Sequence, residues 1–158
     1  MSVTKDLDDV VCALKMDGVF NQQQPKPIES GLNKVIPYSK SFKNEPSYAI
    51  VGQTIKDYQN KCKKKQDSTV IVGIINERCQ PKYVYRYGDK KKRFKERGLS
   101  IAQVSKNGQL AVTGNVQKFK NNCKIKSDDI LAFQLKVSGA IRWWRYYDVK
   151  GKVSAVSS

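Results

Sequence analysis

A strongly alternating segment near the carboxyl end constrains the fold of this chain more than any other feature. Residues 130–138 and 141–149 alternate apolar and polar side chains around Gly139-Ala140, a pair suited to a two-residue type II′ turn that sets Ser138 opposite Ile141. One face of this predicted hairpin is wholly apolar: Leu131, Phe133, Leu135, Val137, Trp144 and Tyr146. Because successive side chains of a strand point to opposite faces, the pattern predicts a β-sheet with one face in a core.

The opposite face of the same hairpin mixes cations with large aromatic rings. Its members are Gln134, Lys136, Trp143, Arg145 and Tyr147. Such a mixture suits a core poorly, whereas exposed rings can stack on bases while neighbouring cations bind phosphates. The alternative is that Trp143 and Tyr147 pack beneath another layer and the cations reach its edge. The sequence favours an exposed stacking surface.

Further β signals extend upstream. Residues 48–58 and Lys82–Tyr87 have strand propensity, and Thr69–Ile75 is a β-branched run typical of a strand buried on both faces. Residues 99–117 predict another hairpin, with a type I′ turn at Asn107-Gly108 that sets Val104 opposite Ala111. The expected fold is therefore all-β, an OB-like or jelly-roll-like barrel or sandwich of six to eight strands.

The amino-terminal third differs from this pattern. Residues 4–17 predict a short amphipathic helix whose apolar stripe is Leu7, Val10, Val11 and Leu14. This helix either packs on its own domain or docks on a neighbouring copy and makes an oligomer. Prolines punctuate residues 21–47, which predict a wrap with only a brief edge strand. We expect an arm at 1–20, a Pro-containing linker at 21–47 and a basic β domain at 48–158.

The chain is strongly basic, with 30 Lys and Arg against 14 Asp and Glu and a formal net charge of +16. A charge of this size favours an anionic partner. The cations recur in three segments between predicted strands, at 61–65, 90–97 and 118–126, and alternate loops of a barrel or sandwich gather at one end. The candidate nucleic-acid-binding residues are Lys63, Lys64, Lys65, Tyr85, Lys90, Lys91, Lys92, Arg93, Phe94, Lys95, Arg97, Lys120, Lys124, Lys136, Trp143, Arg145 and Tyr147.

Several kinds of chemistry lack the residues they need. The chain has no histidine, which excludes Ser-His-Asp and Cys-His catalysis and histidine-ligated zinc. Its cysteines at 12, 62, 79 and 123 form no CxxC pair, so free thiols in a reducing compartment are expected. We predict no catalytic residue, cofactor, metal or small-molecule substrate. We recognise no signal peptide and no transmembrane segment, so the expected location is cytoplasmic, nuclear or within a virus particle.

These observations predict a non-enzymatic, largely sequence-independent nucleic-acid-binding protein with a preference for single strands. Whether the partner is RNA or DNA stays open. The alternative is a virion structural protein, a coat or matrix subunit that self-assembles through residues 4–17 and contacts genome or an anionic membrane. A third hypothesis is a metal-dependent nuclease using Asp128 or Asp129, although such a pair is more typical of a turn. We match no motif of a known family.

Overall fold

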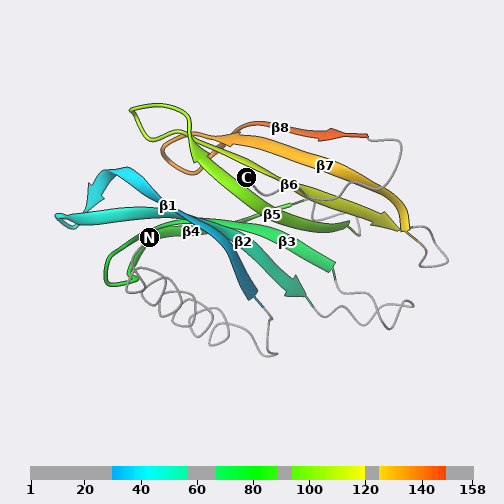
Figure 1. The fold of residues 1–158 in the computed structure, drawn as a ribbon, viewed down its shortest axis with the longest axis horizontal. Helices are drawn as coiled ribbons and strands as arrows, with labels where there is room; N and C mark the ends of the chain where they lie inside the picture. The colour runs from blue at the N-terminus through cyan, green and yellow to red at the C-terminus, as the bar shows by residue number, and fades with distance from the viewer. Residues whose placement is uncertain (1–29, 57–66, 89–93, 120–124, 149–158) are drawn as a thin grey trace.

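The chain folds into eight β-strands (Figure 1). The computed structural model describes residues 30–56, 67–88, 94–119 and 125–148. In chain order the strands are β1 (Ser30–Phe42), β2 (Glu45–Lys56), β3 (Asp67–Asn76), β4 (Pro81–Tyr87), β5 (Phe94–Gln103), β6 (Leu110–Phe119), β7 (Ile125–Leu135) and β8 (Ile141–Tyr147). The predicted all-β fold is confirmed for these residues, and the helix predicted at 4–17 lies outside them. Across these ranges there is no helix that is long and apolar enough to cross a membrane.

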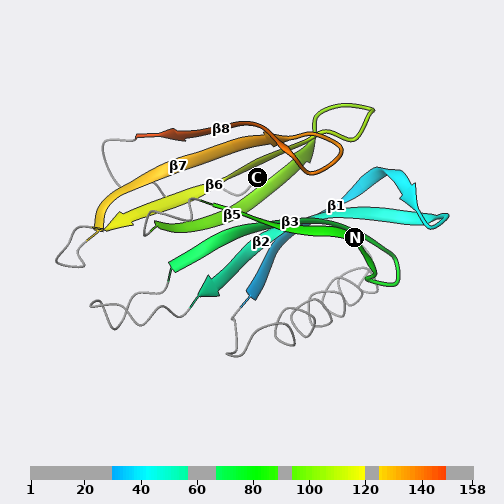
Figure 2. The ribbon, with the colours of Figure 1, turned by 180° about the vertical axis from the view of Figure 1, so that it is seen from behind.

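The strands form one mixed sheet that is not closed and that folds back on itself. Strands β1–β4, here the first unit, pair in antiparallel fashion, and so do β5–β8, the second unit. A single parallel pairing, between Ser68 and Lys95, joins the two units. Strand β4 pairs with the edge of β3 that also pairs with β5, but farther along β3, from Val70 to Ile75. Figures 1 and 2 show the second unit covering one face of the first.

The hydrophobic core lies between the two units. Both contribute to one cluster of buried side chains: Tyr38, Ala49, Val51, Val70, Val72, Ile74, Tyr87, Ile101, Leu110, Val112, Leu131, Phe133 and Leu135. Residues 70–76 of β3 are buried without exception, which confirms that this strand is covered on both faces. The β-branched run therefore reflects a central strand, since both sets of its side chains leave water.

Side chains of β1 close the side on which β1 faces β5. The Asn33 amide donates to the carbonyl oxygen of Gly98 at 2.7 Å, and the Tyr38 hydroxyl donates to that of Gly108 at 2.8 Å. The first of these bonds joins β1 to β5, and the second joins β1 to the β5–β6 turn; the described sheet has no backbone pairing between β1 and β5. Strand β1 spans 13 residues, far more than the brief edge strand expected around residues 35–36. It can include Pro37 because one of its edges has no strand partner within the described sheet.

Both hairpin turns are longer than predicted. In the first, Gln103 pairs with Leu110, and positive φ occurs at Gly108 (89°) but not at Asn107, so the type I′ prediction is wrong. In the second, Leu135 pairs with Ile141, and Gly139 (φ 83°) closes the loop by donating its N–H to Lys136. Glycine fits these two positions because a side chain there would strain the backbone.

The register shift is two residues in each hairpin. Ala102, not Val104, faces Ala111, and Phe133, not Leu135, faces Trp144. A shift of two leaves every side chain on its original face, because strand periodicity is also two. The predicted division into an apolar face and a mixed face is therefore preserved within β7 and β8. It fails for Val137 and Lys136, which lie in the longer β7–β8 turn instead of a strand.

The β3–β4 turn contains a disulfide-bonded cysteine. Cys79 has φ 59° and is nearly buried. The Asn76 side chain organises this turn by accepting hydrogen bonds from the N–H groups of Arg78 and Gln80. The expectation of free thiols is wrong for Cys79, which takes part in a disulfide. The other three cysteines lie outside the described residues.

Candidate nucleic-acid interface

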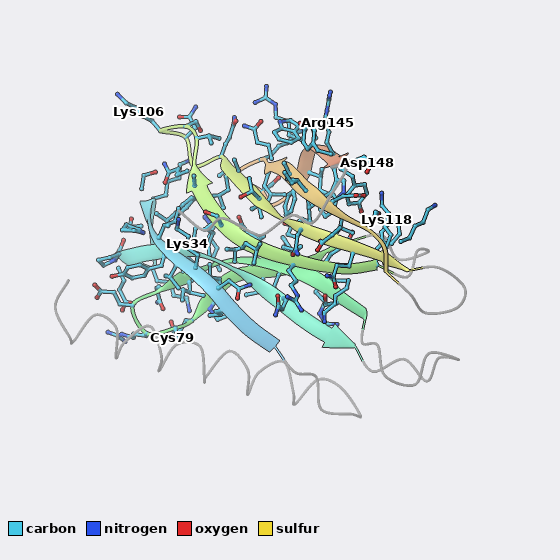
Figure 3. All side chains as sticks on the ribbon, turned by 45° about the vertical axis from the view of Figure 1, so that its right-hand side comes forward. Lys34, Cys79, Lys106, Lys118, Arg145 and Asp148 are labelled. Atoms are coloured by element: carbon cyan, nitrogen blue, oxygen red, sulfur yellow. The ribbon has the colours of Figure 1, made fainter. Side chains whose placement is uncertain are left out.

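The mixed face of the last hairpin lies on the outside of the second unit. Trp143 and Tyr147 are 38% and 47% exposed, whereas Trp144 and Tyr146 pack against the core. Arg145 is also exposed, and Figure 3 shows it on the side of β8 away from the first unit. The alternation of the sequence thus assigned these rings to the correct faces. We call the outward face of β5–β8 the platform; its members are Lys95, Arg97, Ser100, Ala102, Ala111, Thr113, Asn115, Gln117, Asp128, Ile130, Ala132, Gln134, Trp143, Arg145 and Tyr147.

A chain of hydrogen bonds holds the edge of the Trp143 ring. Its Nε1–H donates to Oε1 of Gln134 at 2.7 Å, and the Gln134 amide donates to Oε1 of Gln109 at 3.0 Å. The same Gln109 oxygen accepts from the Arg142 guanidinium at 3.0 Å. The indole is therefore oriented before any ligand arrives, which lowers the entropic cost of stacking.

Small side chains make the floor of the platform between β8 and β5. Ala102 faces Ala111 and Ser100 faces Thr113 across β5 and β6, and Thr113 faces Ala132 across β6 and β7. None of these side chains is larger than threonine. The floor therefore offers a shallow surface that a polymer backbone can approach closely. It lies in the row from Ser100 to Arg145, next to the row in which Asn115 and Ile130 separate Arg97 from Tyr147.

Two cations occupy the β5 side of the platform. Lys95 faces Gln117 and Arg97 faces Asn115, so both side chains share the platform and both are half-buried. Burial and, secondarily, the charge of Arg97 lower the pKa of Lys95. A phosphate beside these cations would oppose this lowering of the pKa, since an anion stabilises the charged form of lysine. The nearby Asp128 carboxylate already accepts hydrogen bonds from Asn115 and Gln117, at 3.4 and 3.3 Å.

Two aromatic residues among the candidates lie on the inner side of the sheet. The Phe94 ring meets Tyr146 edge-on at 5.9 Å, and the Lys118 ammonium sits over both rings, at 5.8 and 5.5 Å. Tyr85 is 47% exposed but stacks on Tyr83 at 5.0 Å, on the face that carries Tyr87 into the core. Neither ring can join Trp143 and Tyr147 in one stacking surface.

Asp128 and Asp129 lie within β7 and point to opposite faces. Asp128 lies on the platform side, while Asp129 is fully buried and forms an ion pair with Lys118 at 2.5 Å. Two carboxylates on opposite faces of a sheet cannot hold one metal ion together. Among the residues that the structure describes, no group of three or more His, Cys, Asp or Glu side chains could hold a metal.

The remaining candidates lie outside the described residues, in the connections 57–66, 89–93 and 120–124 and in the arm. They are Lys63, Lys64, Lys65, Lys90, Lys91, Lys92, Arg93, Lys120, Lys124, Leu7, Val10, Val11 and Leu14.

The strand ends that flank the three basic connections all meet. Lys56 faces Asp67, Ser68 faces Lys95, Phe94 faces Lys118 and Phe119 faces Ile125. All three connections therefore start and finish at one end of the molecule, which we call the basic end. Tyr147 is the aromatic member of the platform nearest to it, because Tyr147 is the last residue of β8.

Sequence reasoning missed two side chains beside the platform rings. Ile130 is 36% exposed and faces Tyr147, and one further step of the alternation would have found it. Arg142 reaches Gln109 because the pairing of β7 with β8 is irregular there, which no local pattern indicates. Lys136, a candidate, is exposed at the start of the β7–β8 turn.

Comparisons of the chain with protein-family models, curated proteins and solved structures find no match.

Proposed function

We propose that this protein binds single-stranded nucleic acid on the platform, without catalysis and with little base specificity. The observation that carries the proposal is the pair of exposed rings, Trp143 and Tyr147, with the Arg145 guanidinium between them. Four strand positions separate the rings, a distance of about 13 Å along β8. Bases of one extended strand can stack on both rings while Arg145 contacts the phosphates between them.

A preference for single strands follows from the same rings. Aromatic side chains stack on the faces of bases, and a duplex hides those faces in its own stack. Each ring is expected to contribute about 1–3 kcal/mol of binding free energy, whatever the base. The hydrogen bonds of Trp143 are satisfied within the protein, so its ring has little capacity to read base edges.

The bound nucleic-acid strand runs from the basic end onto the platform. The connections rich in lysine and arginine start and finish there, and Lys95 and Arg97 continue the cationic surface onto the platform. The small side chains of the floor let the backbone cross from the cations of β5 to the rings of β8. Phosphate contacts of this kind make the affinity fall steeply with salt.

We also propose which kind of all-β fold this is. An open sheet folded into two facing units favours a sandwich of the jelly-roll type over a closed OB-like barrel. The alternative role as a virion coat or matrix subunit makes different demands. A coat subunit forms large closed assemblies, and a matrix subunit binds anionic membranes without nucleic acid.

Two tyrosines of equal exposure provide the test. Tyr147 and Tyr85 are both 47% exposed, but only Tyr147 lies on the platform. We expect Tyr147→Ala to weaken binding of a labelled single-stranded oligonucleotide by about 5- to 150-fold, the equivalent of 1–3 kcal/mol. Tyr85→Ala should bind as the wild type does. A Trp143→Ala, Arg145→Ala double variant should lose more affinity than Tyr147→Ala, together with the tryptophan fluorescence quenching on binding.

The outcomes separate the hypotheses. Equal losses for both tyrosine variants, or a folded Trp143→Ala, Arg145→Ala variant that binds normally, would refute the platform. Equal affinity for single and double strands without quenching would leave only a basic surface. Binding to anionic vesicles but not to oligonucleotides would favour a matrix role instead.

A further inference from the structure

The first unit carries a second apolar surface, on its face away from the core. We call it the back face; its members include Val35, Ile50, Ile71, Ile75 and Val84. Ile50 and Ile71 are 0% exposed and Ile75 is 1% exposed. Their side chains point away from the second unit, because Ala49, Val51, Val70, Val72 and Ile74, which alternate with them along the strands, form the core between the units.

No described strand covers the back face. Strands β5–β8 all lie on the other side of the first unit in both ribbon views (Figures 1 and 2). Neighbours within a sheet flank a side chain but leave its outer end open, so they cannot bring an outward-pointing isoleucine to zero exposure. Something other than the described strands therefore covers the back face.

Cys79 indicates which part of the chain is a candidate to cover this face. It lies in the turn that follows β3, close to Ile75, and it is disulfide-bonded. Figure 3 shows Cys79 and Lys118 at opposite ends of the molecule. The ten residues of β3 separate Cys79 from the basic end by about 30 Å.

Two of the three other cysteines cannot reach this turn. Cys62 precedes Asp67 by five residues, which span at most about 17 Å, little more than half the length of β3. Cys123 precedes Ile125 by two residues and stays within about 7 Å of it, also at the basic end. The α-carbons of a disulfide lie no more than about 7 Å apart. Cys12 alone has the necessary reach.

We infer that residues 4–17 lie on the back face of their own chain and that a disulfide joins Cys12 to Cys79. The apolar stripe Leu7, Val10, Val11 and Leu14 supplies the side chains that cover the buried isoleucines. The twelve residues from 18 to 29 can span up to about 40 Å before β1 begins, which is enough to reach any part of this face. Asp6, Asp8 and Asp9 also complement Arg86, which is exposed on the same face.

In this arrangement the apolar stripe makes an intramolecular contact. It competes directly with the expectation that the stripe joins neighbouring copies, because the same four side chains cannot do both at once. It is independent of the proposed binding of nucleic acid, since the back face and the platform lie on opposite sides of the fold.

The disulfide is tested on the full chain, purified without reductant and digested under non-reducing conditions. Mass spectrometry should find the peptide containing Cys12 linked to the peptide containing Cys79, and this pair should disappear on reduction. A link from Cys79 to Cys62 or Cys123 would overturn the inference. So would a Cys12–Cys79 link found only in a covalent dimer on a non-reducing gel, because the arm would then belong to a second copy.

The docking of residues 4–17 is tested by introducing aspartate inside the apolar stripe and, as a control, on the opposite side of the helix. Val11 lies in the stripe, whereas Met16 lies about 180° from Leu7 around a helix. We expect Val11→Asp to raise the fluorescence of an added hydrophobic dye several-fold with an unchanged far-ultraviolet circular dichroism signal from the sheet. Met16→Asp should leave the dye signal at the wild-type value. Equal signals from the two variants would show that the back face is covered by something else.

Discussion

Tyr83 and Tyr87 show how two identical side chains on one strand can have opposite effects on stability. The hydroxyl of Tyr87 donates to the carbonyl oxygen of Gly139 at 2.5 Å and so ties β4 to the β7–β8 turn. The hydroxyl of Tyr83 is buried without a hydrogen-bond partner. Burial raises the pKa of both groups, that of Tyr83 to about 12. One hydroxyl thus compensates for the loss of water, and the other does not.

The same substitution at both positions should therefore have unequal effects. Tyr87→Phe leaves a buried carbonyl oxygen unpaired and is expected to cost about 1–3 kcal/mol of unfolding free energy. Tyr83→Phe removes a group that pays a desolvation cost, so we expect no change or a small gain in stability. Urea denaturation of both variants measures the difference. A loss at Tyr83 as large as that at Tyr87 would contradict this account.

At the scale of elements, side-chain alternation predicted more than turn chemistry did. The faces of β7 and β8 followed from period-two alternation, and Trp144 and Tyr146 pack against the core from the expected face. The turns did not follow, because Asn107-Gly108 and Gly139-Ala140 fit short turns locally, whereas the tertiary contacts of Gly108 and Gly139 with Tyr38 and Tyr87 accompany longer ones. Long-range contacts of this kind leave no local signal.

The candidate site, like the fold, could be predicted from the sequence only where side-chain alternation was enough. Alternation separated Trp143 and Tyr147 from the core, but it could not say that Phe94 faces inward, since that depends on where β5 begins. The basic run starting at Lys90 resembled a loop, yet Phe94, Lys95 and Arg97 belong to β5. The small-residue floor also required the pairing of four strands, which no single segment encodes.

A close approach of β5 and β6 gives a prediction at this scale. Gly98 faces Gly114, and a Cβ at Gly114 would collide with the backbone carbonyl of Arg97. Because backbone cannot move aside cheaply, Gly114→Ala should lower the unfolding free energy by about 1–3 kcal/mol. Thr113→Ala, at the adjacent exposed position, should change it by less than about 0.5 kcal/mol. Thermal denaturation of both variants checks this, and a stable Gly114→Ala protein would show that the two strands can separate.

For the whole molecule, the dominant quantity is the net charge of +16. Like charges repel one another in the folded state, and salt screens this repulsion over about 10 Å at 0.1 M ionic strength. We therefore expect the melting temperature of the free protein to rise by a few degrees between 10 and 200 mM NaCl. Sucrose at matched osmolality serves as an uncharged control. A melting temperature that falls with salt would indicate that attractive ion pairs, such as that of Lys118 and Asp129, outweigh the repulsion.

The strand order also distributes this charge unevenly. The turns at 43–44, 77–80, 104–109 and 136–140 lie toward the left in Figure 1, while the strand ends that flank the basic connections meet at the other end. A body charged in this way experiences a torque in the field of a polyanion and rotates before it makes contact. With a polyanionic partner, more collisions would then begin with the basic end forward, and the fold would influence how quickly a complex forms as well as how long it lasts.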